Sequence, residues 1–220
     1  MDTLFCHAIR TFRNIHLTRF IHPDVLAPLN NTTRTKWDKN YQSCSNEYPE
    51  PAEVLLNNQH LLPQEGAALD LACGRGANAI CLAENNLIVS AWDISSVALE
   101  QLTKVAKEKK LVIHTKARDV TQHPPETNTF DVIVVSRFLD RTLFHNIKGA
   151  IKDGGLIFYQ TFIKDKVDTS GPKNPDYLLD NNELLNIFKD WNIIYYTEEG
   201  KVGNIEKGFR NQAMLIAQKP

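Results

Sequence analysis

Short apolar runs alternate with helix-like segments along most of the chain, and this alternation limits the folds that the chain can adopt. The first five runs lie at residues 67–72, 88–92, 112–117, 130–136 and 155–162. Apolar residues recur at helical spacing in the segments 77–84, 97–109 and 143–151, which separate several of these runs. Strands that alternate with helices predict a parallel sheet with helices packed on its faces.

The run FDVIVVS at 130–136 is apolar at almost every position, which is typical of a strand buried on both faces of a sheet. We therefore expect it near the centre. The last two runs, 192–198 and 212–218, have no helical pattern between them, so the final strand should be antiparallel. These features predict an α/β fold with a Rossmann-like, doubly wound, seven-stranded and mostly parallel sheet.

Other segments have weaker signals. Residues 52–62 follow Pro51 and predict a helix, and residues 181–188 predict another, capped by Asn181 or Asp180. Residues 163–177, rich in Asp, Gly and Pro, predict a long loop.

The N-terminal residues have a different pattern from the alternating region. Residues 1–20 place apolar side chains at nearly helical spacing with arginines between them. Such a segment is a membrane-surface or transit sequence in some proteins. More commonly it is a helix that caps the main domain, or a poorly ordered extension. Residues 30–35 read as a polar linker. We expect an N-terminal helical extension or linker at 1–36 and one domain at 37–220.

The charge balance and the cysteine pattern exclude some partners. With 25 Lys and Arg against 26 Asp and Glu, the chain has no basic field for a nucleic-acid backbone, so no nucleic acid is expected. No apolar run is long enough to cross a bilayer, and no membrane partner is expected. The cysteines and histidines lack disulfide-scaffold or metal-ligand spacing. We expect a cytoplasmic monomer or homodimer with a small-molecule substrate and no metal.

The sequence LDLACGRGAN at 69–78 has the strongest functional signal. Gly74 and Gly76 allow the backbone to approach a ligand closely before turning into a helix whose free N–H groups face that ligand. This GxGxxA pattern also suits a dinucleotide. Asp70, within the preceding strand, would repel a pyrophosphate and attract an ammonium group, which favours a ligand that carries an amino acid.

The ends of the other parallel strands should meet at the same edge of the sheet. Asp93 follows the glycines by about twenty residues, the separation at which an acid reaches ribose hydroxyls. Ile94 could pack on an adenine, Asp119 could accept its amino hydrogen, and Val120 would add an apolar contact.

The stretches LDLACGRG, AWD at 91–93, ARDV at 117–120, FDVIVVS and the strand at 154–162 resemble the class I S-adenosylmethionine-dependent methyltransferases. The resemblance covers residues 37–220. It is closest to the tellurite-resistance or thiopurine methyltransferase-like branch, through WDKNY at 37–41, GRGAN at 74–78 and the segment 183–200.

The resemblance implies S-adenosylmethionine as cofactor and S-adenosylhomocysteine as product. It implies a binding site made of Trp37 and Tyr41 as a lid, Asp70, Ala72, Gly74 and Gly76 at the methionine, Asp93 at the ribose, Ile94, Asp119 and Val120 at the adenine, and Ser136 and Arg137 beside the sulfonium. Cys73 and Asn78 are further expected cofactor-binding residues. Ala72 departs from the glycine that is usual in the family, and its methyl group fits if its backbone is extended. Cys73 is better explained as a small packed residue than as a nucleophile, because no basic residue beside it in the sequence would lower its pKa.

Methyl transfer is an in-line displacement, so alignment of the reactants should supply most of the acceleration. A hydroxyl or ammonium acceptor would need a general base, whereas a thiol, as its thiolate, or a chalcogen oxyanion already has its lone pair. Arg137, Asp140 and Tyr159 are the candidates for positioning or contacting the acceptor. We expect a small acceptor, held by the loops 163–177 and 199–211, with an anion drawn by Arg137, Arg141, Lys173 and Arg210.

Two other functions remain open from the sequence. An NAD(P)-dependent oxidoreductase is compatible with the glycines and Asp93 but not with Asp70. A non-catalytic S-adenosylmethionine-binding module would keep the fold without turnover.

Overall fold

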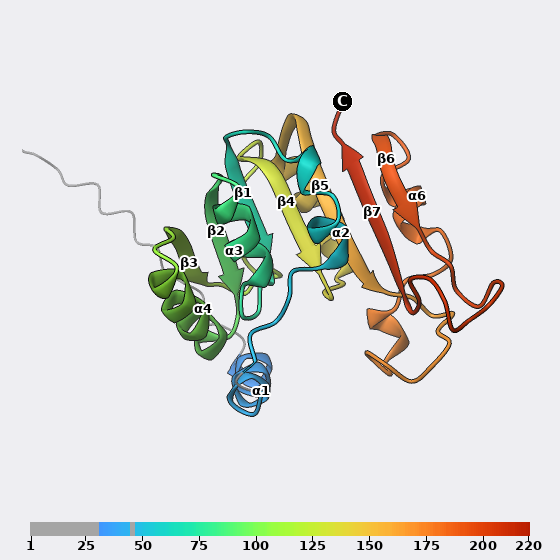
Figure 1. The fold of residues 1–220 in the computed structure, drawn as a ribbon, viewed down its shortest axis with the longest axis horizontal. Helices are drawn as coiled ribbons and strands as arrows, with labels where there is room; N and C mark the ends of the chain where they lie inside the picture. Colours follow the sequence, from blue (N-terminus) through green and yellow to red (C-terminus); the bar gives the residue numbers. More distant parts are fainter. Residues whose placement is uncertain (1–30, 45–46) are drawn as a thin grey trace, which may run out of the picture.

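The computed structural model describes residues 31–44 and 47–220, so the helix predicted for residues 1–20 lies outside the described residues. Seven strands form one sheet in the order β3-β2-β1-β4-β5-β7-β6 (Figure 1). The strands are β1 (Ala67–Leu71), β2 (Ile88–Asp93), β3 (Ile113–Ala117), β4 (Phe130–Ser136), β5 (Ile151–Phe162), β6 (Asn192–Thr197) and β7 (Gln212–Gln218). The strands β1 to β5 are parallel, and β7 runs antiparallel between β5 and β6. The predicted fold class is confirmed.

Strand β4 is the central strand, as predicted, because it pairs with β1 on one side and β5 on the other. Its four residues Val132–Val135 are fully buried. Burial on both faces explains why β-branched residues occupy consecutive positions instead of alternating with polar ones.

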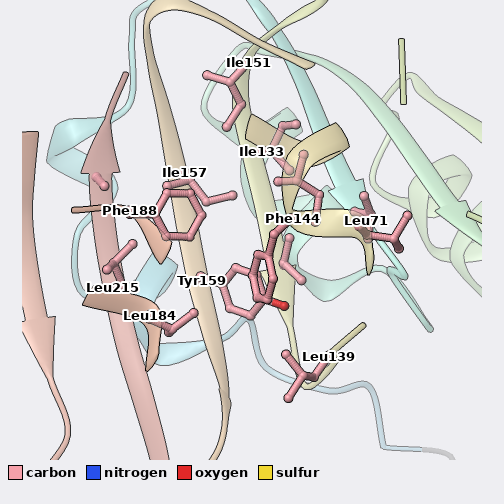
Figure 2. Packing of buried hydrophobic residues seen from close by; sticks show 14 of the residues in the cluster. Leu71, Ile133, Leu139, Phe144, Ile151, Ile157, Tyr159, Leu184, Phe188 and Leu215 are labelled. Carbon is pink, nitrogen blue, oxygen red and sulfur yellow. The ribbon is translucent and has the colours of Figure 1, made fainter. Parts of the chain in front are cut away.

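Helices cover both faces of the sheet. They are α1 (Asn31–Gln42), α2 (Glu53–Leu56), α3 (Ala77–Glu84), α4 (Ser96–Glu108), α5 (Phe144–Ala150) and α6 (Glu183–Ile187), with single 3-10 turns at Gln59–Leu61, Arg141–Leu143 and Pro175–Tyr177. Apolar residues of α2, α3 and α4 pack on one face, and those of α5 and α6 pack on the other. Figure 2 shows the second face, where Phe144 of α5 lies against Tyr159 of β5 and packs edge-to-face with Phe188.

No helix connects β3 to β4, and Arg118 covers part of the sheet face there. Its guanidinium lies 4.0 Å from the ring centroid of Trp92 in β2. It also donates a hydrogen bond to the His123 carbonyl at 2.6 Å and pairs with Glu126 at 3.0 Å. A buried cation needs such partners, and a ring face supplies part of the attraction.

The predicted polar linker at residues 30–35 is wrong for its described part, because residues 31–35 form the start of α1. Contacts with α4 override the weak local helix propensity of this polar segment. Helix α1 continues across residue 36, and the division into 1–36 and 37–220 stays a prediction.

Two predicted helices are shorter in the structure. The segment 52–62 forms only α2 and a 3-10 turn, because the side-chain amide of Asn58 donates to the Val54 carbonyl at 3.0 Å and competes with a continuing helix. In the segment 181–188 the N-cap of α6 is Asn182, in a left-handed conformation, and not Asn181 or Asp180.

The carboxyl ends of β1, β2 and β4 lie at one edge of the sheet, and α1 lies at the same edge beside α4 (Figure 1). Among the described residues, no helix has the length and apolar character needed to cross a membrane.

Replacing Gly76 with Ala should destabilise the protein strongly. Gly76 has φ 75°, and a Cβ there would lie 2.5 Å from a methyl group of Leu102. We expect the free energy of unfolding to fall by about 2 to 4 kcal/mol, from backbone strain and overpacking together. Gly149, in α5, has open space around its Cα, and its replacement with Ala should instead stabilise by about 0.5 to 1 kcal/mol. Denaturant unfolding of both variants is the measurement, and an equal response would contradict the assignment.

Candidate functional site

The chain makes a tight turn between β1 and α3. The Cys73 amide donates to the Trp92 carbonyl at 2.9 Å, and the Gly76 amide donates to the Cys73 carbonyl at 2.8 Å. Ala72, Gly74 and Gly76 all have positive φ, at 54°, 53° and 75°. The expectation of an extended Ala72 is therefore wrong: the turn needs a left-handed residue at this position, which explains why the family pattern has glycine.

Asp70 lies beneath this turn and is fully buried. Its carboxylate accepts from the Ala79 amide at 3.0 Å and from the Asn78 side chain at 3.3 Å. Burial raises the pKa of Asp70 to about 7. In the structure this carboxylate ties the end of β1 to the first turn of α3.

Asp93, at the end of β2, bridges two backbone segments. One carboxylate oxygen accepts from the Gly74 amide at 2.7 Å, and the other accepts from the Ser95 amide at 2.8 Å. Only 6% of Asp93 is exposed, and burial raises its pKa, with a smaller contribution from the nearby Asp38 carboxylate. Asp93 thus fixes the glycine turn against the start of α4.

Asn78 joins the turn to the end of β4. Its side-chain amide donates to the Ser136 hydroxyl at 2.9 Å, and its carbonyl oxygen accepts from the Ala52 amide at 2.9 Å. The structure therefore brings Asp70, Asn78 and Ser136 into one hydrogen-bonded group.

The residues expected at an adenine lie at the ends of β2 and β3. The Arg118 amide donates to the Asp93 carbonyl at 2.8 Å, which holds these two ends together. Ile94 is half-buried, and Val120 is buried in the core. Asp119 is also buried, and one of its oxygens accepts from the amide and hydroxyl of Thr121.

Two aromatic residues of α1 lie over the turn. The Tyr41 hydroxyl is 2.7 Å from the point that a Cβ on Gly74 would occupy. Trp37 stacks on Tyr41 with ring centroids 5.9 Å apart, and 40% of Trp37 is exposed. Burial raises the pKa of Tyr41, so its hydroxyl stays protonated.

The thiol of Cys73 is buried, and burial raises its pKa. A protonated thiol is a poor nucleophile. This environment agrees with the interpretation of Cys73 as a packed residue.

The three candidates for acceptor contacts lie in different environments. Arg137 is exposed, has φ 53°, and its side chain has no partner among the described residues. Asp140 caps the turn Arg141–Leu143 by accepting from the Thr142 amide at 2.9 Å. Tyr159 is fully buried and donates to the Phe138 carbonyl at 3.0 Å, because its position in β5 points it into the core beneath α5 (Figure 2). The structure does not bring the Tyr159 hydroxyl to the glycine turn.

Two of the four cationic residues expected to attract an anion already bind other groups of the protein. Arg141 pairs with Glu183 at 2.8 Å and donates to the Asp176 and Leu178 carbonyls. Arg210 donates to five carbonyls of the connection at 199–211. Both arginines stabilise loops, whereas Arg137 and Lys173 have no partner among the described side chains.

A second polar group, which was not predicted from the sequence, lies at the same edge. Gln160, fully buried in β5, accepts from the Val54 amide at 2.9 Å and donates to Glu53 and to Gln212. Gln160 pairs with Ser136 in the sheet register. The signal was a lone glutamine within the apolar run GLIFYQTF.

Comparisons with known proteins agree with this geometry. Residues 68–155 match a family model described as a methyltransferase domain. No curated protein matches the sequence. TehB from Haemophilus influenzae is similar in structure, with a TM-score of 0.64 and 22% identity over 84% of this chain and 67% of that one.

Two further solved structures share the fold. A methyltransferase from Methanosarcina mazei, dependent on S-adenosylmethionine (SAM), has a TM-score of 0.57 and 18% identity over 78% of this chain and 99% of that one. Coclaurine N-methyltransferase, bound to N-methylheliamine and SAH, has a TM-score of 0.52 and 19% identity over 66% of this chain and 47% of that one. At identities this low, the structural similarity establishes the fold alone.

The matched residues 68–155 contain the glycine turn and the ends of the first four strands. Together with the sheet order, this match indicates a methyltransferase domain over residues 68–155.

Replacing Ala72 with Gly should stabilise the protein. The left-handed backbone costs an alanine about 1 to 2 kcal/mol, and glycine avoids this cost while losing about 0.4 to 1 kcal/mol through the unfolded chain. We expect a gain of about 0.5 to 1 kcal/mol in the free energy of unfolding, measured by urea denaturation. A loss of stability would show that Ala72 is not strained.

The raised pKa of Asp70 predicts a pH dependence of stability. Between its ordinary value of 3.8 and about 7, the folded protein binds more protons at Asp70 than the unfolded chain does. The contribution of Asp70 to the free energy of unfolding therefore falls as the pH rises through this range. Unfolding curves of the wild type and of Asp70→Asn at several pH values should diverge in slope, with the variant depending less on pH. Parallel curves would contradict the assignment.

Proposed function

We propose that this enzyme transfers a methyl group from S-adenosylmethionine to a small acceptor, and that the edge formed by the ends of β1, β2 and β4 holds the cofactor. One observation carries the proposal: Asp93 at the end of β2 holds the Gly74 amide at 2.7 Å and is itself almost completely buried. A carboxylate fixed in this way is suited to accept ribose hydroxyls at the place where the backbone can approach a ligand.

The geometry around the turn fits a ligand of this kind. Gly74 has no side chain, and even a single Cβ there would meet the Tyr41 hydroxyl. The carboxylates of Asp70 and Asp93 suit a ligand that carries a positive charge, and they oppose the pyrophosphate of a dinucleotide.

We assign the cofactor contacts in the order of the strand ends. Ala72, Cys73, Gly74 and Gly76 would face the methionine through the backbone, with Asp70 and Asn78 supporting them from below. Asp93 would take the ribose, and Ile94, Asp119 and Val120 the adenine. Trp37 and Tyr41 would cover the cofactor, and Ser136 and Arg137 would lie beside the reacting end.

The bound cofactor supplies an electrophilic methyl group on a sulfonium. The chain's own residues would orient the two reactants and exclude water from them. Asn78 holds the Ser136 hydroxyl, and the Arg137 amide donates to the Gln160 carbonyl at 2.8 Å, so the wall at the end of β4 is fixed before a ligand binds. Preorganisation of this kind supplies most of the acceleration in a displacement between aligned reactants.

For the acceptor we propose a small molecule, with a thiol or a chalcogen oxyanion as the class that the resemblance of the sequence to the tellurite-resistance or thiopurine methyltransferase-like branch implies. Arg137 and Lys173 are the cations with no described partner that could attract an anion. The loops 163–177 and 199–211 would enclose the acceptor.

Cofactor binding can be tested by thermal unfolding of the wild type and of Asp93→Ala with S-adenosylmethionine, S-adenosylhomocysteine, NAD and NADP. A ligand at 100 times its dissociation constant stabilises the folded state by about 2.7 kcal/mol. We expect a rise in Tm with the two sulfur compounds only, and its loss in Asp93→Ala. Stabilisation by NAD or NADP instead would overturn the proposal.

A further inference from the structure

Helix α1 has no buried residue, although it lies over the proposed cofactor site. Apolar packing therefore contributes little to its position, and its polar contacts with α4 decide where it sits. The helix is amphipathic only weakly, so its sequence gives no apolar face that would dock it elsewhere on the sheet.

Asp38 makes the closest of these polar contacts. One of its oxygens accepts from the Ser95 hydroxyl at 2.6 Å and lies 3.4 Å from the Val97 amide. These groups form the N-terminus of α4, where the helix dipole favours a carboxylate. Arg34 lies farther away, at 3.5 Å from the other oxygen of Asp38, and donates to the Ser96 hydroxyl at 3.0 Å.

The partner of Asp38 is also part of the proposed ribose site. Ser95 is fully buried, and its amide donates to Asp93 at 2.8 Å while its hydroxyl donates to Asp38. The second oxygen of Asp93 holds the Gly74 amide. A continuous series of hydrogen bonds thus runs from α1 through Ser95 and Asp93 to the glycine turn.

The same helix places Tyr41 over that turn, three residues beyond Asp38 and on the same side of α1. The Tyr41 carbonyl accepts from the Gln101 side chain of α4 at 3.2 Å. Loss of the contact between Asp38 and Ser95 would release both ends of this arrangement: the covering aromatic residues and the support of Asp93.

We propose that Asp38 is a positioning residue that couples the docking of α1 to the carboxylate Asp93 and thereby sets how long the cofactor stays bound. The proposal rests on the proposed function, because it assigns S-adenosylmethionine to the turn at Gly74. Asp38 itself need not touch the cofactor.

The test replaces Asp38 with Ala and uses Lys39→Ala as the matched control. Alanine is the best helix former, so neither change weakens α1 itself. Lys39 is exposed on the same helix, and its side chain has no partner among the described residues. Three quantities are measured: the dissociation rates of S-adenosylmethionine and S-adenosylhomocysteine, the Tm without ligand, and the rate of chymotryptic cleavage within α1, after Trp37 or Tyr41.

We expect Asp38→Ala to release both ligands about tenfold faster, the effect of losing one hydrogen bond to a charged group. Chymotryptic cleavage in α1 should accelerate, and the Tm without ligand should stay close to the wild-type value, because α1 contributes no buried residue to the core. Lys39→Ala should match the wild type in ligand release.

Unchanged ligand release in Asp38→Ala would overturn the inference while leaving the proposed function intact. A large fall in the ligand-free Tm would show a general structural role and would also count against it. If the wild type bound neither ligand, the proposed function would fail and the cofactor role of Asp38 with it.

Discussion

The carboxylate of Asp93 is the point on which the arrangement of the site depends. Its two oxygens hold the Gly74 and Ser95 amides, so one buried side chain fixes the turn after β1 and the start of α4 at once. Backbone N–H groups in such turns have no partner in a helix or sheet ladder, and burying them unpaired would be costly. The raised pKa of Asp93 reflects the opposing cost of burying the charge. The hydrogen bonds between the Asp93 carboxylate and these backbone N–H groups therefore offset the cost of burying both, and they hold the site in shape.

The same compensation extends along the edge of the sheet. The side-chain oxygen of Asn78 accepts from the Ala52 amide, and its nitrogen donates to Ser136. The side-chain oxygen of Gln160 accepts from the Val54 amide, and its nitrogen donates to Glu53. An amide side chain can do this because it donates and accepts at once. The short helix α2 is thus fixed to the ends of β4 and β5 by buried polar contacts as well as by its apolar residues. These hydrogen bonds fix the side chains at the ends of β4 and β5, so the proposed ligand site has a rigid polar wall next to the apolar core.

Most of the fold could be predicted from the sequence because each strand and most helices have a local signal. Helix α3 begins and ends at the predicted residues, since glycines precede it and two asparagines follow it. The backbone of Ala72 could not be predicted, because a left-handed alanine is set by the turn around it. Tyr159 is a candidate for acceptor contact in the sequence, and only its packing against Phe144 of α5 shows that it is buried. Residues 31–35 form a helix through contacts with α4. Arg34 donates to the hydroxyl of Ser96, which lies 62 residues further along the chain.

The distribution of charge at the proposed site has a consequence for the reaction. Methyl transfer removes the positive charge of the cofactor, so a carboxylate close to the sulfonium would stabilise the reactant more than the transition state. Asp70 and Asp93 lie at the ends of β1 and β2. Ser136 lies at the end of β4, followed by Arg137, whose side chain has no partner among the described residues. Negative charge is therefore placed where we assign the amino acid and ribose, and a neutral or cationic wall is placed where we assign the reacting centre. This separation allows the same site to bind a cation tightly and still favour the loss of its charge.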